Sequence, residues 1–158
     1  MTILRTEPVR WGSWCVRVLR GEEMITELKI SFFLSKGSFE LDGDAFVVEP
    51  RGFFRHAAEL KRGASVIARA EKSSLARRRF EIRAAGHRLD LESRSWLGRE
   101  YALIMGGEEV GTIRRAGFLG RRCVLEFPDP VPLFLQVFVA YLVLTQAKRE
   151  AAAASSGS

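Results

Sequence analysis

Arginines are the residues of this chain whose type and spacing most clearly suggest chemistry. Residues 51–100 hold 13 Lys and Arg against 6 Asp and Glu, whereas the rest of the sequence is close to balanced. A guanidinium group binds phosphate oxygens through paired hydrogen bonds, and strand residues two apart lie on one face. A phosphate-binding patch is therefore predicted from the arginines of this region, which are Arg77, Arg78, Arg79, Arg83, Arg88, Arg94 and Arg99.

A solvated basic face is the alternative explanation of the same arginines. If they do bind a ligand, an anionic phospholipid headgroup fits better than a nucleic acid, because no aromatic residues alternate with them for base stacking. A protein partner is the remaining option. The sequence does not indicate an oligomeric state.

The other residue types that perform chemistry do not occur in catalytic or metal-binding frames. His56 and His87 belong to no hydrolase or zinc motif. The Asp42-Gly43-Asp44 triplet lacks the later acidic ligands of a calcium loop and predicts a hairpin turn. Cys15 and Cys123 stand far apart and predict reduced thiols. We therefore expect no catalytic residue, no metal, no cofactor and no enzymatic activity.

Short strands would have to position these residues. Apolar residues alternate with polar ones, and Gly, Pro or Asp residues interrupt the pattern every 6 to 12 positions. A weak repeat of about 43 residues accompanies the alternation, as in the similar segments 21–28 and 107–113. Antiparallel strands are predicted at residues 14–19, 24–34, 38–41, 45–49, 53–60, 64–71, 80–84, 87–92, 99–105, 109–115 and 121–127.

One helix, predicted at about residues 131–149, is uncharged from Pro130 to Ala147 and apolar on every face. Its apolar part from Leu133 to Ala147 would span roughly 22 Å, short of the roughly 30 Å of a bilayer's hydrocarbon core. A closed barrel of eleven or more strands is too wide for side chains alone to fill. The sequence therefore predicts a mainly β protein, an antiparallel closed barrel of about 12 strands around a buried C-terminal hydrophobic α-helix. A C-terminal membrane anchor is the alternative.

This pattern resembles the Tubby C-terminal-like superfamily, most closely its LURP-one-related and phospholipid-scramblase-like branch. The similarity is carried by residues 101–105, the Gly107-x-x-Val110-Gly111-x-Ile113 hairpin, residues 121–127 and the helix at 132–149. The resemblance implies a roughly twelve-stranded barrel threaded by its C-terminal helix, and an association with lipids. The Lys and Arg residues with which the Tubby branch binds phosphoinositides have no matching positions here, and no scramblase-type calcium motif is present.

The sequence as a whole favours one domain, residues 1–150, with a flexible tail at 151–158. We expect a binding or adaptor domain that contacts anionic headgroups or a protein through its basic face, with a nucleic-acid-binding barrel as a weaker alternative. Trp11, Trp14 and Trp96 are expected to pack in the barrel or at its rim. The N-terminus lacks the apolar segment of a secretory signal, which predicts a cytoplasmic location and allows peripheral membrane binding.

Overall fold

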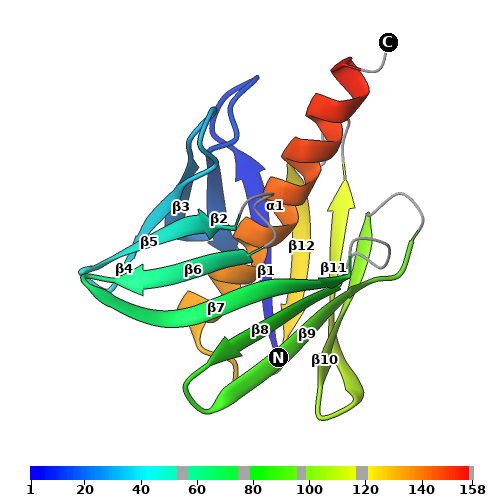
Figure 1. The fold of residues 1–158 in the computed structure, drawn as a ribbon. Coiled ribbons are helices and arrows are strands. Elements are labelled where there is room, and N and C mark those ends of the chain that lie inside the picture. The colour runs from blue at the N-terminus through cyan, green and yellow to red at the C-terminus, as the bar shows by residue number, and fades with distance from the viewer. Residues whose placement is uncertain (53–56, 75–78, 96–98, 117–120, 157–158) are drawn as a thin grey trace.

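The computed structural model shows a closed antiparallel barrel with one helix in its interior (Figure 1). It describes residues 1–52, 57–74, 79–95, 99–116 and 121–156. Within these residues the strands are β1 (Thr2–Pro8), β2 (Val16–Arg20), β3 (Glu23–Ile30), β4 (Gly37–Leu41), β5 (Asp44–Arg51), β6 (Ala57–Arg62), β7 (Ser65–Ser74), β8 (Arg79–Ala84), β9 (His87–Ser93), β10 (Glu100–Met105), β11 (Glu108–Ala116) and β12 (Arg122–Phe127), followed by helix α1 (Leu133–Ser156). The predicted fold class is confirmed.

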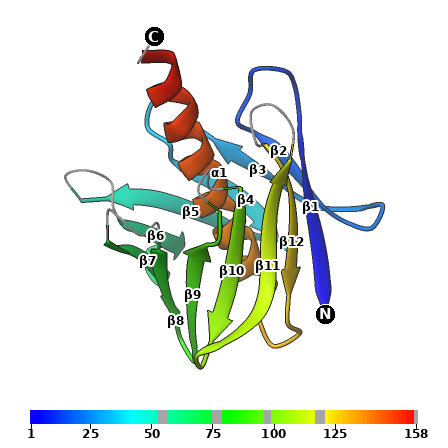
Figure 2. The same ribbon diagram turned by 90° about the vertical axis from the view of Figure 1, so that its right-hand side faces the viewer.

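Each strand pairs with its neighbours along the chain, and β1 pairs with β12 to close the barrel. Because the strands alternate in direction, successive connections lie at opposite ends. One end carries tight turns at positions that need positive φ, such as Gly21 and Gly86, with φ of 62° and 75°. The other end, here called the loop end, carries the longer connections, among them residues 9–15 and 31–36. The last turns of α1 extend past the loop end (Figures 1 and 2).

The interior of the barrel is filled by alternate strand residues and by the whole circumference of α1. In β8, for example, Phe80 and Ile82 are buried while Arg79 and Arg83 point outward. Every residue of α1 from Leu135 to Ala147 is buried. Burying a large apolar side chain stabilises a fold by about 1.5–3 kcal/mol. The barrel therefore depends on its helix for most of its central core.

Helix α1 differs from the predicted helix at both ends. It starts at Leu133, after Pro132 accepts the first helical hydrogen bonds, and it continues to Ser156. Six of the eight residues expected to form a tail are thus helical, because the alanines at 151–154 have the highest helix propensity. No helix in the described part of the chain combines the length and hydropathy needed to cross a membrane.

Most strand ends lie within three residues of their predicted positions, and two departures among the described residues are larger. Strand β1 was not predicted, and β3 ends at Ile30 rather than at Leu34. The residues after Ile30 form a connection that closes on itself, since the Ser31 amide donates to the Lys36 carbonyl at 2.9 Å. An apolar run that resembles a strand in the sequence is therefore a loop.

Candidate functional site

The arginines predicted to form one patch are distributed over the barrel surface. Arg79, at the start of β8, binds Asp90 at 2.7 Å, and this hydrogen bond raises the pKa of Arg79. Arg94 contacts Glu109 at 3.2 Å. Arg99 lies in the connection before β10 and its amide donates to Ser95 Oγ at 2.9 Å. Arg77 and Arg78 lie outside the described residues.

Two of the predicted arginines do come together. Arg83 on β8 and Arg88 on β9 are directly opposite each other, and Arg69 on β7 is opposite Arg83. All three side chains are mostly exposed. Arg83 and Arg88 make long ion pairs with Glu81, at 3.8 and 3.7 Å, and Arg88 makes another with Asp90 at 4.0 Å. A groove of about 430 Å³ runs beside Arg69 and Arg83. Sequence reasoning missed Arg69 because the register between β7 and β8, which includes a bulge, sets its position.

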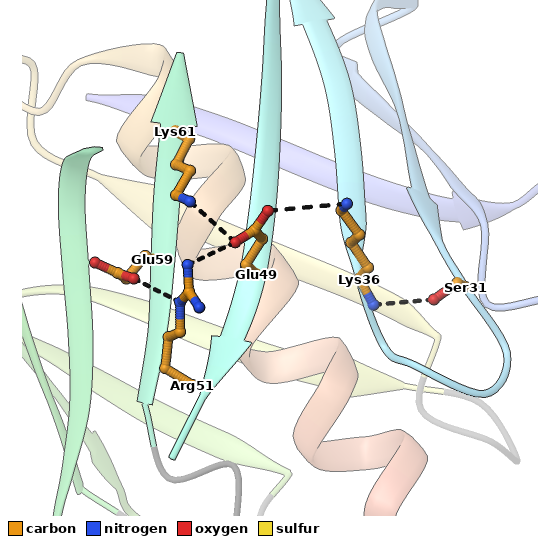
Figure 3. A network of polar contacts seen from close by, with 6 residues as sticks. All are labelled: Ser31, Lys36, Glu49, Arg51, Glu59 and Lys61. Atoms are coloured by element: carbon orange, nitrogen blue, oxygen red, sulfur yellow. Dashed lines mark hydrogen bonds and ion pairs between the residues drawn. The ribbon is translucent and has the colours of Figure 1, made fainter. Parts of the chain in front are cut away.

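Acidic residues also pair with the basic residues on neighbouring strands of the barrel. Glu49 on β5 accepts a hydrogen bond from Lys61 at 3.0 Å and contacts Arg51 and Lys36 at 2.8 and 3.8 Å (Figure 3). The Lys61 hydrogen bond lowers the pKa of Glu49. Glu59 pairs in turn with Arg51 at 2.7 Å. Such alternation of charge is typical of a solvated, ion-paired surface, so the arginines alone do not mark a binding site.

An exposed apolar segment stands out at the loop end. The side chains of Phe32, Phe33 and Leu34, in the β3–β4 connection, are 66%, 85% and 62% exposed. The two phenyl rings meet edge to face, with centroids 5.0 Å apart. Three consecutive large apolar residues in solvent represent an energetic cost that folding alone does not explain.

The same connection is firmly attached at its base. The Lys148 ammonium, from α1, donates to the carbonyls of Ser31 and Phe32 and to Ser35 Oγ, the first at 2.7 Å and the last at 3.0 Å. The Tyr141 hydroxyl donates to the Ser35 carbonyl at 2.6 Å. Ser35 itself has a φ of 54°, a left-handed conformation that these contacts hold in place. The segment is thus a preformed loop that presents its apolar residues outward.

The β1–β2 connection at the same end has a similar construction. Arg121 is only 8% exposed, and its guanidinium donates to the carbonyls of Arg10 and Ser13 at 3.1 and 2.6 Å. Trp14 is buried, as predicted, but Trp11 is 92% exposed, which contradicts its expected packing. Trp96 lies outside the described residues. We call Trp11, Phe32, Phe33 and Leu34 together the loop-end patch.

The two connections that carry the loop-end patch contain basic residues. Residues 9–15 and 31–36 contain no Asp or Glu but include Arg10 and Lys36, and the Lys36 ammonium lies 3.8 Å from Glu49 on β5. The helix leaves the barrel at Lys148-Arg149, and the following Glu150 is paired with Arg115 at 2.8 Å. Aromatic side chains with flanking cations are typical of protein segments at a membrane–water interface.

Among the described residues, those that sequence reasoning considered for other chemistry do not assemble into a reactive site. Within the described residues no three His, Cys, Asp or Glu side chains lie close enough together to hold a metal ion. Burial raises the pKa of the Cys123 thiol to about 11, so it stays protonated at neutral pH. His87 is partly exposed beside the β8–β9 turn, and His56 lies outside the described residues.

Comparison of the chain with protein-family models, with curated proteins and with solved structures found no match. The resemblance to the Tubby C-terminal-like superfamily therefore stays a prediction, and the function must be argued from the geometry of this chain.

Proposed function

We propose that this chain is a non-enzymatic binding domain that attaches to anionic lipid membrane surfaces through the loop-end patch. The observation that carries the proposal is the pairing of exposed aromatic residues with rigid attachment. Two cations, the partly buried Lys148 and the buried Arg121, hold the two loops through hydrogen bonds to their carbonyls. Loops that are already ordered lose little conformational entropy when they insert into a membrane, which favours binding.

The expected strength of binding follows from the exposed side chains. Transfer of each large apolar side chain from water gives about 1.5–3 kcal/mol when burial is complete, and an interfacial position gives part of this. Each Lys or Arg near an anionic surface adds about 1 kcal/mol. Four apolar residues and the cations beside them therefore suffice for reversible attachment, with an affinity that falls as the salt concentration rises.

A membrane fits these residues better than a protein partner does. The loop-end patch is divided between two separate connections, and neither connection carries an acidic residue that an anionic surface would repel. A lipid surface accepts separate insertions without matching their shape, whereas a specific protein interface needs a continuous complementary surface.

Vesicle co-sedimentation tests the proposal. The chain is expected to sediment with vesicles of phosphatidylcholine and phosphatidylserine and to bind pure phosphatidylcholine vesicles more weakly. Phe33→Ser should reduce binding about tenfold, because it removes one inserted side chain. Ile3→Ser is the matched control, since Ile3 is 50% exposed on β1 outside both loops.

Three results would contradict the proposal. Equal binding by Phe33→Ser and Ile3→Ser would show that the loops do not insert, and absence of binding at low salt would exclude the membrane. If Arg83→Gln/Arg88→Gln lost binding and Phe33→Ser did not, the lipid contact would lie on β8 and β9 and not at the loop-end patch. Since Phe33 is 85% exposed, its replacement should leave the fold and the unfolding temperature unchanged.

A further inference from the structure

The junction between β3 and β4 is the least closed part of the barrel wall. These strands pair only at Lys29↔Ser38 and Ile30↔Gly37. Every other pair of neighbouring strands has four to six paired positions. If this register continued, residues 26–28 of β3 would pair with residues 39–41 of β4, but they do not. We call this opening the seam.

Charge repulsion would disfavour closing the seam. If the register of the two paired positions continued, Glu27 would stand opposite Glu40. Like charges directly opposite each other on neighbouring strands are destabilising. Neither glutamate makes a hydrogen bond or ion pair with another described residue that would neutralise it. The sequence thus keeps two strand edges apart although the fold would allow them to pair.

A groove of about 390 Å³ follows the outside of the seam. Apolar side chains of Met24, Ile25 and Val47 line it together with three charged residues, which are Glu27, Glu40 and Lys29. Met24 is 53% exposed. The groove therefore combines an apolar floor, a net charge of −1 from two glutamates and one lysine, and main-chain groups that have no strand partner on that side.

We propose that the seam binds an extended, basic peptide segment of a partner protein by strand addition. Unpaired strand edges present N–H and C=O groups that an incoming strand satisfies. A lysine or arginine of the segment would lie between Glu27 and Glu40 and remove their repulsion. Apolar residues at alternate positions would point the other way, toward the buried Phe39 and Phe46, because neighbouring strand residues point to opposite faces. This site is separate from the loop-end patch and does not depend on membrane binding.

Fluorescence anisotropy with two synthetic peptides of about six residues tests the proposal. One peptide alternates valine and lysine, and the other alternates valine and glutamate. Only the lysine peptide should bind, and Glu27→Gln/Glu40→Gln should weaken it about tenfold. Glu22→Gln/Glu108→Gln is the control with the same charge change, since both residues are exposed beside tight turns. No binding, equal binding of both peptides, or equal loss in the control would overturn the proposal.

Hydrogen exchange locates the contact. The amides of residues 26–28 and 39–41 should gain protection when the lysine peptide binds, and protection confined to other strands would overturn the assignment. Glu40→Lys supplies a second readout, because it places opposite charges across the seam. This variant should protect the same amides without peptide and should lose peptide binding. A variant that binds the peptide as the parent does would show that the open seam is not the site.

Discussion

Replacement of Lys148 by Met tests whether the helix holds the apolar loop in place. The substitution keeps the aliphatic length but removes the donor to Ser31, Phe32 and Ser35. A hydrogen bond from a charged group contributes about 1.5–3 kcal/mol, but water can replace it at the exposed carbonyls. We therefore expect a loss of about 2–3 kcal/mol in the free energy of unfolding. For a chain of this size that corresponds to a decrease of roughly 5–10 °C in unfolding temperature.

Denaturant unfolding and hydrogen exchange together measure this effect. In Lys148→Met the amides of Ser35 and Lys36, which bond to Ser31 in the parent, should exchange faster. Lys29→Met is the matched control, because Lys29 is exposed on β3 and its replacement makes the same change in net charge. The reasoning is refuted if both variants unfold at the same denaturant concentration and the amide protection of the loop is unchanged.

Four further predictions concern the barrel. In Gly37→Ala the new methyl group would lie 2.8 Å from the Tyr141 ring. The free energy of unfolding should therefore decrease by about 1–3 kcal/mol, which denaturant unfolding would measure. Val139→Asp places a charge at a fully buried helix position and should prevent soluble folding, and recovery of a normally folded variant would contradict the structure. Because the pKa of Glu49 is lowered in the fold, its stabilising effect is present above its ordinary pKa and is lost on acidification. Stability should therefore fall less between about pH 5 and pH 3 in Glu49→Gln than in the parent. The Cys123 thiol should not react with a thiol reagent at pH 8 until the chain unfolds, which titration of thiols with and without denaturant would show.

Much of the fold could be predicted because its signals are local. Turn residues such as Gly86 and Gly106 have positive φ values of 75° and 59°, and they separate strands that pair in chain order. The uncharged run before Lys148 identified the central helix, since a helix that is apolar all round must be surrounded. Strand β1 was missed because its position depends on pairing with β12, more than 100 residues away in the sequence.

The loop-end patch depends on contacts that a sequence does not display. Phe32, Phe33 and Leu34 continue the alternating pattern of β3, so they were interpreted as strand residues. Their exposure follows from the bonds that Lys148 makes with a segment 117 residues earlier. A tripeptide of large apolar residues directly before Ser35 and Gly37 was the available signal, since both of these residues favour turns.

The order of the elements along the chain also determines when this protein can fold. Helix α1 follows all twelve described strands, so the ribosome completes the strands of the barrel before it synthesises the helix that fills the interior. Until residues 133–147 are synthesised, the inward side chains of the strands have no central partner, and β1 must wait for β12 to close the wall. Exposed apolar strands of this kind aggregate readily. Chains truncated before the helix should therefore be insoluble or bound by chaperones, and folding of this protein should occur late in translation.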